Sequence, residues 1–264
     1  MEIGEPDFPS PDVVIQAGQR ALDQRQTHYT AANGLPELRQ AIADSYHGCA
    51  ALDASRIVVT PGASGALQLA MAILLNPGDG IMLADPGYPC NRHIASLFNA
   101  EVQPVPVDEH TDYQLTAEMV EQSWQANTRV VLLATPSNPT GTIINRDEVT
   151  AIAALVASKG AALIIDEIYQ GLVYDSEPFS ALSVTDDVFI INSFSKFYGM
   201  TGWRIGWLVV PEGFREVANR LAQNMFLAAP TLSQYAAIAA LGAEAQQELL
   251  RRRDIVHQRR DRLL

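Results

Sequence analysis

Lys196 is the residue of this chain with the most distinctive chemistry. Only two of the 18 Lys and Arg residues are lysines. A primary amine can form a Schiff base with a carbonyl compound, whereas a guanidinium cannot, because it stays protonated. Lys196 stands in the segment Ser193-Phe194-Ser195-Lys196, upstream of Arg204. The sequence makes Lys196 a candidate covalent anchor, and an ordinary surface lysine is the alternative.

Hydroxyl and guanidinium groups near Lys196 could bind an anion. Ser193 and Ser195 supply hydroxyls, and Arg204 supplies a charge-assisted donor. A second segment, Thr60-Pro61-Gly62-Ala63-Ser64, is a loop of small residues that leads into a helical pattern. Backbone N–H groups and the helix dipole favour a phosphate at such a place. The two segments together predict a phosphate site.

Three further side chains follow predicted strands. Asp166 ends a buried apolar run, and a buried carboxylate needs a hydrogen-bonding or cationic partner such as a protonated heterocyclic nitrogen. Asn138 lies between two prolines that restrict its backbone. Tyr88 follows a Pro-Gly turn and could stack on a planar ring. Taken singly, the three also fit a helix cap, a generic turn and a core tyrosine.

Short apolar, β-branched runs predict the strands that position these residues. The runs are Ile57–Thr60, Ile81–Ala84, Val102–Val107, Val130–Ala134, Ala162–Asp166, Val188–Asn192 and Ile205–Val210. Helical patterns lie between most of them, at Ala66–Leu75, Pro89–Phe98, Leu115–Gln125 and Asp147–Ser158. This alternation predicts an α/β fold with a mostly parallel, seven-stranded sheet flanked by helices. Ligands of such sheets bind beyond the carboxyl ends of the strands.

Composition narrows the possible partners. The 264 residues carry a formal charge of -12, which opposes binding to nucleic acid. No apolar run is long enough to span a membrane, and the first residues do not form a signal sequence, so a cytoplasmic protein is expected. Cys49, Cys90 and five scattered histidines show no metal-ligand spacing. The arginines of 251–262 follow a helical pattern that reads as a solvated face.

An amine, a carboxylate, an amide, an aromatic ring and a phosphate site beyond one sheet edge fit pyridoxal 5'-phosphate better than other common cofactors. A nicotinamide-dependent short-chain dehydrogenase would have a similar glycine-rich turn. It would also need a catalytic Tyr-x-x-x-Lys, and neither Lys159 nor Lys196 has a tyrosine four residues before it. The sequence therefore favours a pyridoxal phosphate site.

The chain resembles the class I and II aminotransferases of the aspartate aminotransferase superfamily, which have the fold type I. The resemblance covers essentially the whole chain and keeps the family's motif order. The motifs are Gly4-Glu5-Pro6-Asp7-Phe8, Tyr29-x-x-x-x-Gly34-x-x-x-Leu38-Arg39, Asn138-Pro139-x-Gly141, Asp166-x-x-Tyr169, and Ser193-x-Ser195-Lys196 with Arg204.

By this resemblance, Lys196 would carry the cofactor as an aldimine and then move the substrate proton. Asp166 would pair with the pyridinium nitrogen and remain ionised, because an opposite charge lowers a carboxyl pKa. Asn138 and Tyr169 would hydrogen-bond the ring oxygen, and Tyr88 would stack on the ring.

The resemblance also implies phosphate and substrate contacts. Backbone N–H groups of Ala63 and Ser64 would hold the phosphate together with Ser193 and Arg204. Tyr29 would reach the phosphate from a second subunit, so a homodimer is expected. Gly4 and Asn138 would lie near the substrate.

The expected organisation has three parts: an N-terminal segment, 1–13, on the side of a small domain; a large cofactor-binding domain, 14–244; and the start of a helix, 245–264, that leads into a C-terminal domain absent here. The chain is thus expected to be truncated at both ends. Family members carry the arginine that grips the substrate carboxylate in that C-terminal domain. They also place a lysine at the position of Ser64 in one subgroup of aspartate-specific enzymes, and its absence argues against a dicarboxylate specialist.

The function expected from the resemblance is transfer of an α-amino group between an L-amino acid and a 2-oxo acid. A C–S β-lyase or related eliminating enzyme of the same fold type is the nearest alternative. An effector-binding domain of a transcription regulator that shares the fold is the alternative from another class.

Overall fold

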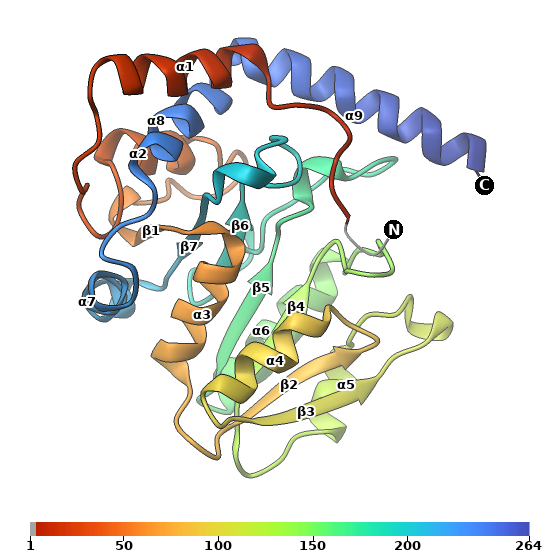
Figure 1. Cartoon of the computed structure of the whole chain (residues 1–264). Coiled ribbons are helices and arrows are strands. Elements are labelled where there is room, and N and C mark those ends of the chain that lie inside the picture. The colour runs from red at the N-terminus through yellow and green to blue at the C-terminus, as the bar shows by residue number, and fades with distance from the viewer. Residues whose placement is uncertain (1–3, 264) are drawn as a thin grey trace.

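The computed structural model describes residues 4–263 (Figure 1). One seven-stranded sheet has the order β1-β7-β6-β5-β4-β2-β3. Its strands are β1 (Ile57–Thr60), β2 (Gly80–Asp85), β3 (Glu101–Pro106), β4 (Thr128–Ala134), β5 (Ala162–Asp166), β6 (Phe189–Ser193) and β7 (Gly206–Val209). β1 and β5 have the predicted bounds, and the others differ by one or two residues at an end. The predicted α/β fold with a mostly parallel sheet is confirmed.

Helices cover both faces of this sheet. They are α1 (Asp12–Asp23), α2 (Pro36–Asp44), α3 (Gly62–Leu74), α4 (Pro89–Leu97), α5 (Ala117–Gln122), α6 (Arg146–Ser158), α7 (Arg215–Phe226), α8 (Thr231–Ala240) and α9 (Ala243–Leu263). In Figure 1, α3 and α4 lie in front of the sheet, and α5 and α6 lie behind it. Short 3-10 helices occur at Ala54–Arg56, Glu109–Thr111, Gln170–Leu172, Ala181–Ser183, Thr201–Trp203 and Glu212–Phe214.

The strands divide their apolar side chains between two cores, because successive residues point to opposite faces. Ile164 packs in the core formed with α3, α4 and α7. Leu163 and Ile165 pack in the other core, to which α2, α6 and α8 contribute. β5 is therefore buried on both faces, which accounts for its continuous apolar run.

β7 brings the residues before it to the carboxyl end of β6. β7 pairs antiparallel with both β6 and β1, and Gly206 lies opposite both Ser193 and Thr60. The chain therefore turns back through Lys196 and enters β7 two residues after Arg204. The direction of β7 explains why both side chains lie at the edge where β1, β4 and β5 also end.

Four helices, α1, α2, α7 and α8, were not expected from the sequence. They are not among the helical patterns found between successive parallel strands, so the strand–helix alternation gave no reason to look for them. α1 packs mainly along α8, and α2 packs against α8 and β1. Together α1, α2 and α8 form a group at one end of the sheet in Figure 1.

The basic stretch of α9 is more than a solvated face, which corrects the expectation from sequence. Arg259 contacts both carboxylate oxygens of Asp7 at 2.9 Å, and Arg252 donates to the carbonyl of Pro9. Both guanidinium groups also lie over the ring of Phe8, at 5.2 and 5.4 Å from its centroid. These arginines hold the N-terminal segment 4–10 against α9.

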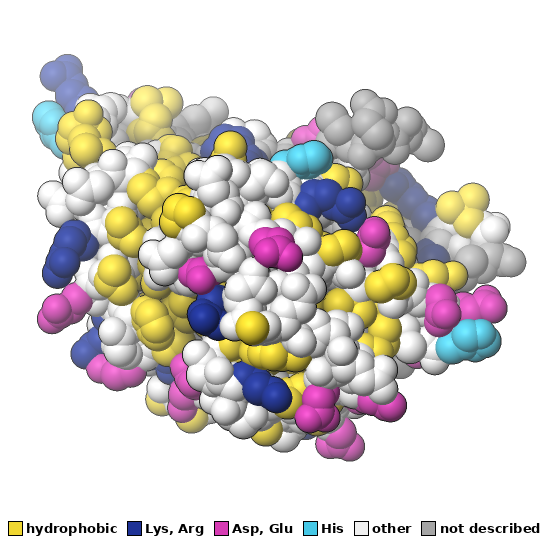
Figure 2. Space-filling model, turned by 90° about the horizontal axis from the view of Figure 1, so that it is seen from below, with side chains coloured by type: hydrophobic (Ala, Val, Ile, Leu, Met, Phe, Trp, Pro, Cys, Tyr) yellow, Lys and Arg dark blue, Asp and Glu magenta, His cyan; other side chains and the backbone are white. Residues whose placement is uncertain are grey.

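Two surface properties bear on possible partners. Figure 2 shows one face on which Lys and Arg side chains lie scattered among Asp and Glu, without a continuous basic surface for a phosphate backbone. Within residues 4–263, no helix combines the length and the apolar character needed to cross a bilayer.

Candidate active site

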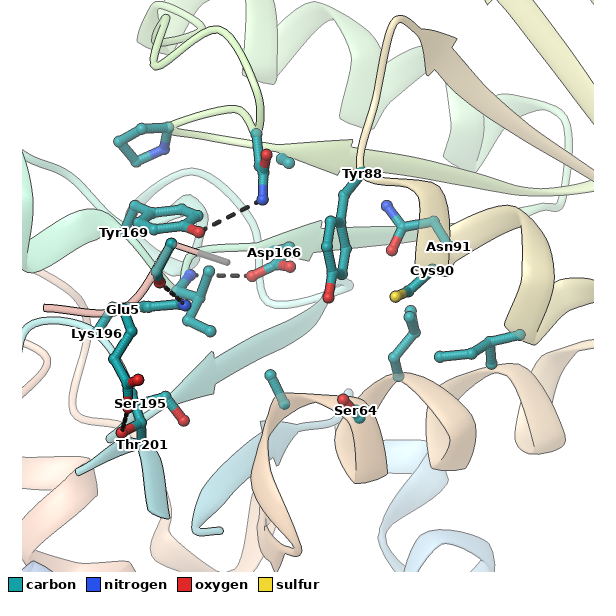
Figure 3. Close-up of a pocket in the computed structure, with 18 of the residues that line it drawn as sticks. Glu5, Ser64, Tyr88, Cys90, Asn91, Asp166, Tyr169, Ser195, Lys196 and Thr201 are labelled. Atoms are coloured by element: carbon teal, nitrogen blue, oxygen red, sulfur yellow. Dashed lines mark hydrogen bonds between the residues drawn. The ribbon is translucent and has the colours of Figure 1, made fainter. Parts of the chain in front are cut away.

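A cavity of about 360 Å³ lies at the carboxyl ends of the strands. It brings together most of the residues that the sequence predicts for the site. Its walls include Gly4, Ala63, Ser64, Tyr88, Asn138, Asp166, Tyr169, Lys196 and Arg204. Figure 3 shows Lys196 and Tyr169 on one side of Asp166 and Tyr88 on the other. Apart from Gly4, these residues lie at or after the ends of β1, β2, β4, β5 and β6, and the sheet edge brings them together.

Lys196 reaches the cavity from the loop after β6. Its Nζ donates a 2.6 Å hydrogen bond to the carbonyl of Gly4 and lies 5.9 Å from the centroid of the Tyr169 ring. Burial lowers the pKa of Lys196, and the neighbouring Arg204 lowers it further, while Glu5 and Asp166 oppose this. A lowered pKa increases the fraction of neutral amine, the form that acts as a nucleophile or a base.

Asp166 is the last residue of β5. Its Oδ1 accepts a 3.0 Å hydrogen bond from the backbone N–H of Ile168. Burial raises the pKa of Asp166 to about 6, against the opposing effects of that hydrogen bond and of Lys196. The expected low pKa depended on a cation bound beside the carboxylate, and in the protein alone burial dominates. A buried carboxylate of this kind is suited to a cationic ligand.

The side chains of Asn138 and Tyr169 approach each other across the cavity rim. Asn138 Nδ2 lies 3.5 Å from the Tyr169 hydroxyl, at the limit of a hydrogen bond. Asn138 follows β4, and Tyr169 follows β5. Two neutral polar groups are therefore available to one acceptor in the cavity.

The first turn of α3 and Arg204 form a cradle suited to an anion. α3 has no side-chain N-cap, so its first N–H groups have no side-chain partner there. Gly62 has φ +74°, and a Cβ on it would lie 2.7 Å from Arg204 Nη2. A Cβ on Gly206 would lie 2.9 Å from the backbone nitrogen of Ala63. Gly62 lets the guanidinium approach the helix start closely, and Gly206 lets β7 lie close to the same helix start.

The structure places Ser193 differently from the sequence-based expectation. Ser193 is buried and is not among the residues that line this cavity. Its Oγ lies 2.9 Å from Ser195 Oγ and 3.1 Å from the carbonyl of Ile205. Ser195 lines the cavity instead, because the chain turns toward Lys196 only after β6 has ended.

Tyr29 also lies away from this cavity. Its side chain is 79% exposed, on the connection between α1 and α2. This position leaves the tyrosine free to contact another molecule, and its reach into a second subunit stays a prediction.

Several cavity residues were missed by the sequence analysis. Cys90 and Asn91 lie in the first turn of α4, two and three residues after Tyr88, so their position near a predicted site residue was a usable signal. Glu5 hydrogen-bonds to Thr201, and both line the cavity. No local pattern links residues this far apart in sequence.

The described residues contain no group of three or more His, Cys, Asp or Glu side chains that could hold a metal ion. They do fit pyridoxal phosphate. An amine that is partly desolvated, a buried carboxylate without a neutralising ligand, and a glycine-lined helix start with a guanidinium match the aldehyde, ring nitrogen and phosphate of that cofactor.

The chain is similar in sequence and fold to proteins that are named aminotransferases. The chain is 40% identical to valine–pyruvate aminotransferase of Mycobacterium tuberculosis over 94% of this chain and 65% of that protein. It is 33% identical to a probable aspartate aminotransferase of Methanocaldococcus jannaschii, over 97% and 71%. The chain thus spans 65% of the length of the first of these relatives.

Solved structures also show similarity to aminotransferases. An aminotransferase from Mycobacterium tuberculosis superimposes with a TM-score of 0.90 at 40% identity, covering 94% of this chain and 65% of that one. An aspartate aminotransferase from Thermus thermophilus superimposes with a TM-score of 0.93 at 28% identity, covering 98% and 69%. The sequence model of the family described as aminotransferase class I and II matches residues 1–264. The chain therefore belongs to the class I and II aminotransferase family.

Proposed function

We propose that the protein transfers an α-amino group between an L-amino acid and a 2-oxo acid with pyridoxal phosphate as its cofactor. The observation that carries the proposal is a single cavity in which Lys196, Asp166, Arg204 and the uncapped start of α3 meet. The names of the aminotransferase relatives support amino-group transfer. Aminotransferase family members generally use pyridoxal phosphate, which supplies an aldehyde for the amino group and a ring that accepts electrons.

In this proposal Lys196 has two roles. Its amine attaches the cofactor, and when it is free it takes the proton from the α-carbon of the amino acid. Burial supports the second role by lowering the pKa of Lys196 toward the range in which an amine is an effective base. The Gly4 carbonyl, 2.6 Å from Nζ, would orient the amine in the free protein.

Asp166 would hold a proton on the ring nitrogen of the cofactor by remaining ionised beside it. Such a charge pair would offset the cost of burying Asp166, because burial is what raises the pKa of this carboxyl to about 6. Tyr88 would stack on the ring, while Asn138 and Tyr169 would donate to the ring oxygen.

The anion cradle would bind the cofactor phosphate through the N–H groups of Ala63 and Ser64 and through Arg204. The position of Ser195 in the cavity wall supports it as a hydroxyl donor in place of Ser193, which would act by holding Ser195 in position. Tyr29 of a second subunit would complete the phosphate site in a homodimer, while Gly4 and Asn138 would contact the substrate.

A β-eliminating lyase is less well supported, because the matched relatives carry aminotransferase names. The two reactions differ in the fate of nitrogen. Amino acids with labelled nitrogen should be incubated with the protein, pyridoxal phosphate and a panel of 2-oxo acids. Transfer of the label to the 2-oxo acid would support the proposal. Release of the label as ammonia without transfer would refute it, and Lys196→Ala should abolish either reaction.

A further inference from the structure

A second cavity lies on the side of the residues after β5 and β6 that faces away from the first cavity. It has a volume of about 280 Å³ and is separate from the cavity that contains Lys196. Glu167 lines it from the end of β5, and His47 lines it after α2. The proposed transamination uses neither residue.

Among the described residues that line this second cavity, Glu167 is the only carboxylate. The side chain is 1% exposed. Its Oε1 accepts hydrogen bonds from the Ser180 hydroxyl at 3.0 Å and from the Ala181 N–H at 2.8 Å. Both donors use the same oxygen, so Oε2 remains for another partner. Among residues 4–263 no Lys, Arg or His forms an ion pair with Glu167.

The end of α2 adds to the negative character of this cavity. α2 ends at Asp44, and Ser45, Tyr46 and His47 continue from it into the cavity wall. The carboxyl end of a helix carries partial negative charge, which favours a cation nearby. Burial raises the pKa of Glu167 to about 7, as expected for a carboxylate that lacks a counter-ion.

Aromatic side chains form much of the remaining wall. They are Tyr46, Phe179, Phe197, Tyr198 and Trp207. Aromatic faces attract organic cations, and cages of such rings recognise alkylammonium groups. One ring already holds a cation, since the Arg146 guanidinium lies 4.7 Å from the Phe179 centroid while it donates to Ser183 Oγ at 2.7 Å.

We propose that this second cavity binds a small organic cation of the alkylammonium class, with the Glu167 carboxylate as its counter-ion and the aromatic side chains as its wall. The described lining contains no Lys or Arg that could form an ion pair with a carboxylate. The site therefore selects an amine or a quaternary ammonium over a zwitterionic amino acid. It is distinct from the proposed transamination site and does not depend on that activity.

Tetramethylammonium is the probe for this site. It has no N–H group, so it cannot react with an aldehyde cofactor in the neighbouring cavity. Its binding to the cofactor-loaded protein should be measured by isothermal titration at a pH above the Glu167 pKa. The neutral molecule tert-butyl alcohol, of similar shape, is the matched control, and sodium chloride keeps the ionic strength constant. We expect tetramethylammonium to bind at least about tenfold more tightly than the alcohol.

Two variants test the assignment. Glu167→Gln keeps an acceptor for Ser180 and Ala181 but removes the charge, and should weaken tetramethylammonium binding about tenfold or more. His47→Lys leaves the buried wall intact and adds an ammonium at the exposed rim that can compete for Glu167, whereas His47→Gln should bind as the original protein does. Circular dichroism would verify the fold of each variant.

Failure to bind tetramethylammonium would overturn the proposal. Equal binding of the alcohol would overturn it as well, because the cavity would then be merely apolar. So would unchanged affinity in both Glu167→Gln and His47→Lys. Transaminase activity is not part of this measurement, so its loss or retention leaves the result interpretable.

Discussion

Asp166 and Glu167 are consecutive carboxylates that serve different cavities. Burial raises both pKa values, to about 6 for Asp166 and about 7 for Glu167. Asp166 shares its cavity with the amine of Lys196, whereas Glu167 has two neutral donors and an aromatic surround. Successive side chains at a strand end point in opposite directions. One strand end can therefore supply two sites, and the neighbouring charges decide what each carboxylate can do.

The largest expected effect comes from removing the amine that distinguishes the first cavity. Lys196→Ala should lower the rate of amino transfer by about 10³-fold or more, because attachment and proton transfer are both lost. Lys196→Arg keeps the positive charge beside Asp166 and should be equally inactive. Borohydride reduction followed by mass spectrometry would locate the attached cofactor. Attachment that persists in Lys196→Ala would contradict the assignment.

Asp166→Asn and Glu167→Gln should differ in their effect on catalysis. The variant loses the charge that would face the ring nitrogen, so kcat/KM should fall by about 10²- to 10³-fold. Glu167→Gln is the matched control and should change kcat/KM by less than about tenfold, since Glu167 does not line that cavity. Steady-state kinetics would measure both. Equal losses in the two variants would show that the two cavities are not independent.

Glu167 should also change how the unfolding free energy depends on pH. Its pKa is raised from 4.5 to about 7, so the folded protein retains a proton that the unfolded chain loses in this range. The stabilisation from this proton is complete below about pH 4.5, and it disappears as the pH rises through about 7. Relative to Glu167→Gln, the original protein should lose roughly 3 kcal/mol of unfolding free energy across that window.

Urea unfolding of both proteins at several pH values would measure this difference. The difference in unfolding free energy between Asp166→Asn and the original protein should stop changing near pH 6, where the raised pKa of Asp166 lies. Parallel stability profiles for Glu167→Gln and the original protein would argue against a proton held by Glu167.

The smallest expected effect concerns the N-terminal segment, which borders the first cavity and does not line the second. Arg259→Gln removes the exposed pair with Asp7 and should cost less than about 1 kcal/mol of unfolding free energy. Hydrogen exchange should nevertheless increase in the segment 4–10, because one of its attachments to α9 is lost. High salt should produce a similar increase in the original protein. Unchanged exchange in both tests would mean that the remaining contacts of the segment, such as those of Gly4, Glu5 and Pro9, suffice to hold it.

The strands and most site residues were predictable because their signals are local. β5 is a buried apolar run, and Asp166 follows it at the edge where parallel sheets bind ligands. Lys196 stands out by its rarity and by the hydroxyl residues before it. The helices α1 and α8 escaped notice because they pack on each other outside the repeating strand–helix pattern.

Residue type and spacing alone determined three things: the α/β class, which residues follow the strands, and which residues are candidates for a site around Lys196. Tertiary structure decided which groups share a cavity. It buried Ser193 and placed Ser195 in the wall of the first cavity, joined Glu5 to Thr201, and attached the arginines of α9 to the N-terminal segment. It also placed the side chains of Asp166 and Glu167 in different cavities. The physical reason is that burial, hydrogen-bond geometry and electrostatic partners depend on distances through space between segments that are remote in the chain.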